Sequence, residues 1–449
     1  MKLKTRLLFI LIIFLAAALP VGAENLPWIE HLTVSGMKVL LQRTGSELLE
    51  VSLLLKSGSG LDRESQQGAA LVMNSLVNIK LGDEKDEYAD ITLNTYPDYT
   101  VINFATTKSE LTRVLREVRE LLTLPLYNYD IITDLKDLYS TDLRAASPWA
   151  KAYQKFGECF YGPEHPYNEQ LEPEMLKKVG GEAIYRWYRK TYQPGNAILS
   201  IAGGTKLRMK KIAKYFRKMD NETVDLRLML EPVLLDRDQQ LQFEDPNGRI
   251  ATFCMGYPAP RVQDHEYPAF RVINYYLENF QHYFEEVRVK RGLMYTGFVY
   301  YNYLEKPRAP AIVFMAMTDQ DNLAKVETET VAVVQHLITD GIAQSQIDLV
   351  VKTMKADADN RALAGEGVAY RNALCEYLQT SLLYDSTALD LLAKVTTADI
   401  KQAAAKYLQH YVRVAYVPSK QATDLHHRAG DLPAAPTPEQ KEESLPLSP

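Results

Sequence analysis

Short apolar runs and amphipathic stretches follow one another along the chain in two similar rounds. In the first round, the apolar run at residues 51–55 predicts a strand, and a Gly/Ser turn leads into a helix that begins near Gly68. In the second round, the apolar run at residues 251–257 predicts a strand, and a proline-containing turn leads into a helix that begins near Tyr267. This repeat, at a distance of roughly 200 residues, predicts a chain built from two similar halves.

The ends of the two halves also correspond. A helix predicted at residues 182–192 is followed by Pro-Gly-Asn and by a strand at residues 197–202. A helix predicted at residues 397–410 is followed by a strand at residues 412–417, and both helices carry an acidic residue near their start, which suits the helix dipole. We therefore expect an α+β fold of two homologous domains, each a β-sheet covered by helices on one face.

The length of 449 residues suits two domains of roughly 200 residues each. One stretch between the halves is charged and has little secondary-structure signal, and the end of the chain is rich in proline, alanine and charged residues, which predicts disorder. We expect a signal peptide at residues 1–23, an N-terminal domain at 24–217, a linker at 218–245, a C-terminal domain at 246–418 and a disordered tail at 419–449.

The start of the chain has the pattern of a secretory signal. Lys2, Lys4 and Arg6 precede an apolar run at residues 7–19, and a small-residue cleavage site ends at Ala23. An uncleaved membrane anchor is the alternative, but the run is about 13 residues long, which is shorter than the ~20 that span a bilayer. We therefore expect cleavage after Ala23, a periplasmic or secreted protein and no stable membrane span.

Charge and cysteine content narrow the classes of function. The formal net charge is −6 at pH 7, which gives no support to nucleic-acid binding. The three cysteines, Cys159, Cys254 and Cys375, show no C-x-x-C spacing and lie among apolar or aromatic residues. We expect buried thiols here and not a disulfide framework.

The segment at residues 68–76, Gly-Ala-Ala-Leu-Val-Met-Asn-Ser-Leu, resembles the zinc helix of the insulinase/pitrilysin (inverzincin) metallopeptidases, especially the branch that includes the mitochondrial processing peptidase. In that family the helix carries H-x-x-E-H. Laid on this motif, the two histidine positions fall on Leu71 and Ser75, and the glutamate position falls on Asn74. Leucine has no donor atom for zinc, and neither serine nor asparagine replaces the general base. The resemblance therefore implies the family's fold with a degenerate zinc site.

The remaining histidines do not restore a zinc site. None of the eight histidines stands in an H-x-x-E-H or H-E-x-x-H spacing. The family's third ligand is a glutamate on a later helix, which corresponds to residues 130–148, and this stretch has four aspartates but no glutamate. We expect no metal cofactor in this chain and no peptidase activity from the chain alone.

Three other segments extend the resemblance over roughly residues 28–418. They are Asp-Tyr-Thr at residues 98–100, Tyr-Gly-Pro-Glu-His-Pro-Tyr at residues 161–167 and Tyr-Gln-Pro-Gly-Asn-Ala at residues 192–197. Taken singly, each is an ordinary strand or turn with Gly, Pro or Asn. Their order and spacing together carry the resemblance.

The second half keeps a segment that resembles the family's Arg-x-x-x-Gly-Leu-x-Tyr element, from Arg288 to Tyr295. In the family these two residues hydrogen-bond the substrate and help to stabilise the tetrahedral intermediate, a role that suits a guanidinium fork and a phenol donor. In the two-chain branch the element acts on a partner's zinc site, inside a clamshell chamber of which each chain forms half. Without the resemblance, the segment is interpreted as a basic helix end capped by Gly292.

Three hypotheses follow. The first is an exported, non-catalytic subunit that pairs with a zinc-bearing homologue, or forms a homodimer, binds a peptide by strand addition and supplies Arg288 and Tyr295 in trans. The second is a structural or scaffolding protein in which these residues serve only local packing. The third, a self-sufficient metallopeptidase, is disfavoured by the histidine inventory.

Overall fold

The computed structural model describes residues 29–62, 66–82, 88–123, 129–144, 146–168, 171–204, 206–221, 226–246, 248–364, 367–383 and 385–419. The expected signal peptide lies outside these residues, and so does the expected tail except for Ser419.

The N-terminal half forms a six-stranded sheet with the order β1-β2-β6-β3-β5-β4. Its strands are β1 (Ile29–Val34), β2 (Met37–Gln42), β3 (Leu48–Leu55), β4 (Ala89–Thr95), β5 (Thr100–Thr107) and β6 (Ala197–Ala202). The last strand, β6, lies between β2 and β3, parallel to the first and antiparallel to the second.

The C-terminal half forms a five-stranded sheet with the order β7-β11-β8-β10-β9. Its strands are β7 (Gln239–Asp245), β8 (Ala251–Pro258), β9 (Thr296–Tyr301), β10 (Ala311–Thr318) and β11 (Val412–Pro418). Here too the last strand lies between two others, parallel to β7 and antiparallel to β8. The two sheets share this topology, which confirms the predicted similarity of the halves. Strand β7 falls in the stretch that we expected to be a linker.

Helices cover both sheets, so the fold is α+β as predicted. The helices of the N-terminal half are α2 (Ala69–Gly82), α4 (Leu111–Leu121), α5 (Tyr129–Arg144), α6 (Pro148–Tyr161), α7 (Pro173–Lys178), α8 (Gly181–Thr191) and α9 (Met209–Lys214). Those of the C-terminal half are α10 (Tyr267–Glu278), α11 (His282–Phe284), α12 (Leu323–Thr339), α13 (Gln344–Ala364), α14 (Val368–Leu378), α15 (Asp385–Leu392) and α16 (Thr397–Tyr407). Short turns are η1 (Ser59–Leu61), η2 (Pro194–Asn196), the π-helical η3 (Glu285–Val289) and η4 (Gln320–Asn322).

The alternating directions of the side chains along the strands explain why each sheet is covered on both faces. In β3, Val51 and Leu53 point into the core beneath α2, α4 and α8, whereas Leu54 points to the opposite face. Successive side chains of a strand point to opposite faces of the sheet, so a strand that is apolar at nearly every position is buried on both. The second face of each sheet therefore needs a cover of its own.

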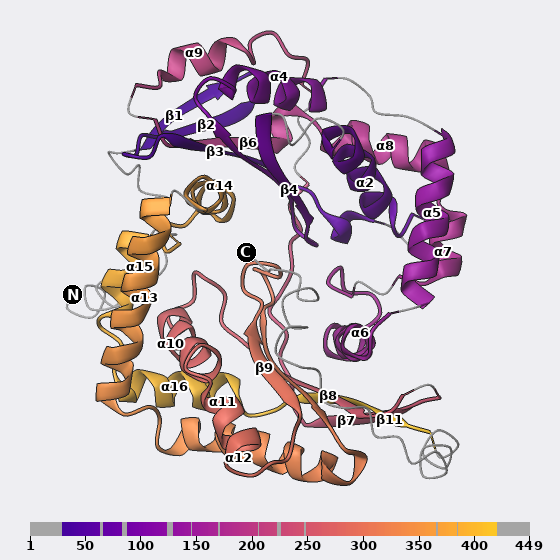
Figure 1. The fold of residues 1–449 in the computed structure, drawn as a ribbon, viewed down its shortest axis with the longest axis vertical. Helices are drawn as coiled ribbons and strands as arrows, with labels where there is room; N and C mark the ends of the chain where they lie inside the picture. The colour runs from indigo at the N-terminus through magenta and orange to yellow at the C-terminus, as the bar shows by residue number, and fades with distance from the viewer. Residues whose placement is uncertain are drawn as a thin grey trace, which may run out of the picture.

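That cover comes from the other half of the chain. Helix α14 packs on β2, β3 and β6 of the N-terminal sheet, and helix α6 packs on β8 and β11 of the C-terminal sheet (Figure 1). Phe156 of α6 lies so close to Gly256 of β8 that a Cβ atom at Gly256 would stand 2.3 Å from the ring. The two halves thus exchange one helix each.

Polar contacts fix α14 to the N-terminal sheet. Glu50 of β3 accepts hydrogen bonds from the N–H groups of Gly367 and Ala369, the latter at 3.0 Å, and so caps the start of α14. One turn further on, Asn372 donates to Gln42 at 2.8 Å. Burial raises the pKa of the Glu50 carboxyl, although the backbone donors oppose this. A side chain of one half therefore caps a helix of the other.

A buried ion pair joins the halves a second time. Asp98, which is 1% exposed, accepts a hydrogen bond from Nε of Arg308 at 2.8 Å and another from the hydroxyl of Tyr167. Nη2 of Arg308 also contacts the hydroxyl of Tyr377 at 3.4 Å. Burial raises the pKa of Asp98, and the nearby donors and Arg308 oppose this. Two of the segments that carry the family resemblance, 98–100 and 161–167, thus meet at this junction.

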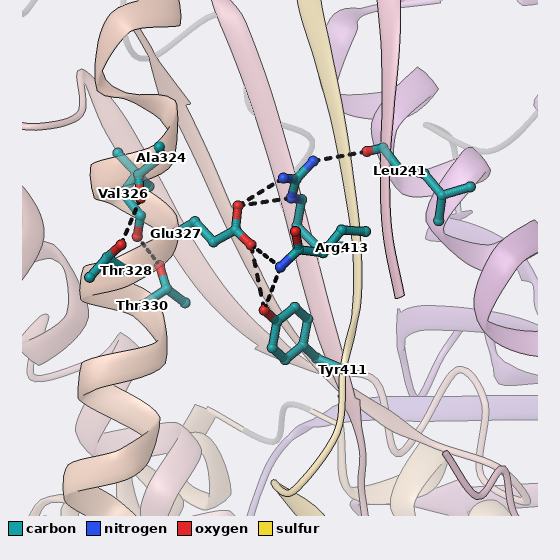
Figure 2. Close-up of polar contacts among 9 residues, drawn as sticks. Leu241, Ala324, Val326, Glu327, Thr328, Thr330, Tyr411 and Arg413 are labelled. Atoms are coloured by element: carbon teal, nitrogen blue, oxygen red, sulfur yellow. Dashed lines mark hydrogen bonds and ion pairs between the residues drawn. The ribbon is translucent and has the colours of Figure 1, made fainter. Parts of the chain in front are cut away.

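A further ion pair fastens α12 to the outer face of the C-terminal sheet (Figure 2). Glu327 accepts hydrogen bonds from Nη2 and Nε of Arg413 at 2.8 and 3.1 Å, and Nη1 of Arg413 donates to the carbonyl of Leu241 at 3.0 Å. The hydroxyl of Tyr411 lies 3.4 Å from the other oxygen of Glu327. One carboxylate therefore ties α12 to β11, and through Arg413 to β7.

Candidate functional site

Helix α2 carries the segment that resembles a zinc helix, and a partly buried carboxylate fixes its start. Asp62 accepts hydrogen bonds from the N–H of Gly68 at 2.9 Å and of Ala70 at 3.2 Å. These are among the N–H groups that lack a partner within the helix. Burial raises the pKa of Asp62 to about 7 despite these donors. Gly68 adopts a φ of +92°, which few other residues tolerate.

The side chain of Asn74, the residue expected at the glutamate position of the motif, is hydrogen-bonded on all sides within the protein. It is 2% exposed, and its amide nitrogen donates to Oγ1 of Thr95 at 2.6 Å and of Thr100 at 3.1 Å. Its amide oxygen accepts from the hydroxyl of Tyr192 at 2.7 Å. An amide with this set of partners supports packing and cannot act as a general base.

Leu71 and Ser75 lie one turn apart on the same helix, as the two histidines of the motif would. The Ser75 hydroxyl donates to the Leu71 carbonyl at 2.8 Å and lies 2.5 Å from the hydroxyl of Tyr139 on α5. Helix α5 lies in the stretch in which the third zinc ligand was expected, and its Tyr139 contacts Ser75. The side chains of Leu71, Ser75 and Tyr139 are one aliphatic group and two hydroxyls, and these are not the nitrogen, sulfur or carboxylate donors that zinc prefers.

Within the described residues, no group of three or more His, Cys, Asp or Glu side chains is arranged to bind a metal ion. The side chains of Leu71, Ser75 and Tyr139 likewise do not fit a zinc ion.

Arg288 lies in the opposite half, at the end of a π-helical turn. The N–H of Gly292, which has a φ of +65°, donates to the Arg288 carbonyl at 2.8 Å, so the turn ends with a glycine cap. The Arg288 side chain is exposed, and its guanidinium carbon lies 5.3 Å from the ring centre of Phe284. Single π-turns are rare and are frequent at functional sites.

Tyr295 precedes β9 and is 49% exposed. Its N–H donates to the Met317 carbonyl at 2.8 Å, and its hydroxyl donates to Oδ1 of Asp319 at 2.7 Å. The hydrogen bond to Asp319, followed by burial, raises the pKa of the phenol. Both side chains are exposed to solvent. No hydrogen bond joins Arg288 to Tyr295 in the described part of the chain.

The two outermost strands that follow these sites differ at their free edges. Among the described residues, strand β4 pairs only with β5, and strand β9 pairs only with β10. At β9, however, the N–H of Val299 donates to the carboxylate of Glu278 at 2.6 Å. A side-chain carboxylate that occupies an edge N–H blocks the addition of another strand at that point.

Two residues of these sites were not predicted from the sequence. Tyr139 lies in the stretch expected to supply a third ligand, but the motif requires a glutamate there and a tyrosine does not match it. Asp319 follows an apolar strand and gave no signal beyond an ordinary turn.

Comparison with known proteins agrees with this architecture. Residues 178–354 match the family described as "Peptidase M16 inactive domain". The structure of a protease from Helicobacter pylori is 18% identical, with a TM-score of 0.77 over 88% of this chain and 100% of that chain. A peptidase M16 inactive domain from Pseudomonas fluorescens is 17% identical, with a TM-score of 0.72 over 87% and 98% of the two chains.

The periplasmic protease PqqL from Escherichia coli is 14% identical, with a TM-score of 0.67 over 94% of this chain but only 52% of PqqL. No curated protein matches the sequence. The chain therefore has the two-domain fold of M16-like peptidases. None of the helices in the described ranges combines the length and apolar character that a membrane span requires.

Proposed function

We propose that this chain is a non-catalytic subunit of a heteromeric insulinase-like metallopeptidase. The observation that carries the proposal is that helix α2 of an M16-like fold lacks side chains that could bind zinc or act as the general base. Leu71, Asn74 and Ser75 occupy the ligand and base positions, and Asn74 and Ser75 are hydrogen-bonded within the protein. The zinc ion and the general base then belong to a partner, and this chain closes the chamber.

In this proposal, Arg288 and Tyr295 act in trans on the peptide bound at the partner's zinc site. Their exposure supports the role, because neither side chain is buried in the half that carries it. A guanidinium offers a fixed fork of donors to developing negative charge, and a phenol offers one directed hydroxyl. The glycine-capped turn before Tyr295 is compatible with either a functional or a purely structural segment.

The free edge of β4 is the proposed site for an extended peptide. Strand addition gives affinity through main-chain hydrogen bonds and is a recurring mode of peptide recognition. Strand β4 begins shortly after α2, and no strand in the described residues pairs with its outer edge. The corresponding edge of β9 is blocked by Glu278, which leaves β4 as the better candidate.

The partner is proposed to be a zinc-bearing homologue, with a homodimer as the other possibility. PqqL offers a parallel, because this chain matches 52% of it and also matches its separately solved first half with a TM-score of 0.66. In this proposal, a second chain takes the place of the half of PqqL that this chain does not match. The signal-like N-terminus and the description of PqqL as periplasmic support an exported, periplasmic location.

A scaffold with no part in proteolysis is the second candidate. The hydrogen bond between Tyr295 and Asp319 favours it, because that bond occupies the only proton that the phenol can donate. In a scaffold, Arg288 and Tyr295 would contribute only to local packing.

Capture of the partner tests the proposal. The tagged chain, recovered from the periplasm of its own host, should retain a homologue that has an intact H-x-x-E-H motif. The complex should cleave oxidised insulin B chain, and a chelator should abolish the cleavage, whereas the chain alone should be inactive. Zinc-dependent cleavage by the chain alone would contradict the proposal, and a complex that lacks any zinc-bearing homologue would favour the scaffold.

A further inference from the structure

The end of strand β10 holds the segment that contains Tyr295 at three successive residues. The Met317 carbonyl accepts from the N–H of Tyr295 at 2.8 Å, Oγ1 of Thr318 donates to the Leu293 carbonyl at 2.5 Å, and Asp319 accepts from the Tyr295 hydroxyl at 2.7 Å. The first two contacts fix the backbone at Tyr295 and two residues before it. The third fixes the direction of the hydroxyl.

Asp319 is itself well anchored. It follows directly on the buried strand β10, and its carbonyl accepts from the N–H of Asn322 at 3.0 Å in the turn η4. Its carboxylate is exposed and forms no ion pair with another described residue. A half-exposed tyrosine on a fixed backbone would otherwise be free to rotate its hydroxyl, so this carboxylate determines where the proton points.

The chemistry of a phenol then limits what Tyr295 can offer a ligand. A phenol has one proton to donate, and its oxygen can also accept. When the hydroxyl donates its proton to Asp319, the phenol oxygen can interact with a ligand only as a hydrogen-bond acceptor. A negative charge brought to that oxygen would also meet the charge of Asp319, and like charges repel.

We infer that Asp319 is a positioning residue for Tyr295, and that the pair accepts a hydrogen bond from a main-chain N–H of a bound peptide. The inference rests on the proposed function, because it concerns the same Arg288–Tyr295 element. It changes the role expected from the family resemblance, in which both residues donate to an oxyanion. In this chain Arg288 alone donates hydrogen bonds to negative charge on the substrate. Tyr295 accepts a hydrogen bond and so helps to set the register of the peptide backbone.

Titration of Tyr295 tests the positioning without any partner. The mature chain is labelled with ¹³C at the ζ carbon of tyrosine, and the Tyr295 signal is assigned by its loss in Tyr295→Phe. We expect its midpoint to lie above the ordinary value near 10 and to fall in Asp319→Asn, which keeps an acceptor but removes the charge. The matched control is Asp321→Asn, an exposed aspartate of the same turn, which should leave the midpoint unchanged. An unchanged Tyr295 midpoint in Asp319→Asn would overturn the inference.

Peptide binding to the metal-depleted complex with a zinc-type partner tests the accepting role, with oxidised insulin B chain as the probe. Tyr295→Phe should weaken binding about fivefold, the size of effect of one hydrogen bond. Asp319→Ala should weaken it equally, and the double variant should be no worse than either single one. Additive losses, or full affinity in Asp319→Ala, would overturn the accepting role. If the complex does not bind the probe at all, the accepting role and the peptide-binding part of the proposed function both fail, whereas the titration still decides whether Asp319 positions Tyr295.

Discussion

Arg308 and Asp98 form an ion pair across the junction between the two halves of the chain, with Nε of the guanidinium 2.8 Å from the carboxylate. The carboxylate is fully buried and also accepts from Tyr167. Removing one partner of a buried pair leaves an uncompensated charge, and this cost is larger than the net gain of forming the pair. The junction should therefore be sensitive to the loss of either residue.

Asp98→Ala should lower the free energy of unfolding by roughly 3 kcal/mol, because Arg308 then remains near the junction without its carboxylate. Urea unfolding followed by circular dichroism measures this. The matched control is Glu174→Ala, which removes an exposed ion pair with Lys177 and should cost less than about 1 kcal/mol. Equal losses in the two variants would contradict a joining role for Asp98.

Asp62 should make stability depend on pH. Burial raises its folded-state pKa to about 7, whereas the unfolded chain releases this proton near pH 4. The contribution of Asp62 to stability is therefore fully present below pH 4 and is lost as the pH rises to 7, with a slope of up to about 1.4 kcal/mol per pH unit.

Asp62→Asn should remove this slope. Unfolding free energies measured between pH 4 and pH 8 should show a flatter profile for the variant than for the natural chain. Asp90→Asn, which changes an exposed carboxylate on β4, serves as the control and should keep the natural profile. A variant of Asp62 with the same pH dependence as the natural chain would show that its carboxyl is not held protonated.

Metal analysis addresses the degenerate zinc site directly. The purified mature chain should contain no stoichiometric zinc, because Leu71, Ser75 and Tyr139 are poor zinc ligands. A chelator should therefore leave its melting temperature unchanged. Near-equimolar zinc by elemental analysis, together with chelator-sensitive cleavage of peptides, would contradict the assignment.

The trans role predicts a kinetic effect without a loss of assembly. In a complex with a zinc-bearing partner, Arg288→Ala should reduce kcat/KM by roughly 100-fold, the scale seen when a donor to a developing oxyanion is removed. Arg288→Lys should also be defective, because an ammonium does not reproduce the planar fork. Full activity in both variants, with pairing intact, would favour the scaffold.

Much of the fold could be predicted from local patterns. The strands predicted at 51–55 and 251–257 are parts of β3 and β8, and the helices predicted from Gly68 and Tyr267 begin within one residue of those positions. These elements were visible because apolar periodicity and turn residues act over a few neighbouring positions. The resemblance of residues 68–76 to a zinc helix rests on a local motif of the same kind, and its loss of ligands stays a prediction.

The contacts between the halves could not be predicted in this way. An apolar helix face shows that the helix is buried, but not which sheet buries it, so the exchange of α6 and α14 left no trace in the pattern. The partners Asp98 and Arg308 stand 210 positions apart. Strand β7 is largely polar and owes its conformation to pairing with β11, which is a tertiary effect that outweighs local propensity.

The exchanged helices hold equivalent places in the two halves, since each is the third helix after the strand that corresponds to β5 or β10. Two identical copies of one half, each lending that helix to the other, would be a domain-swapped dimer. The chain therefore has the geometry of such a dimer whose two copies became joined end to end. It follows that neither half should be expressible as a separate folded fragment, whereas the two halves produced as separate chains should find each other and reassemble.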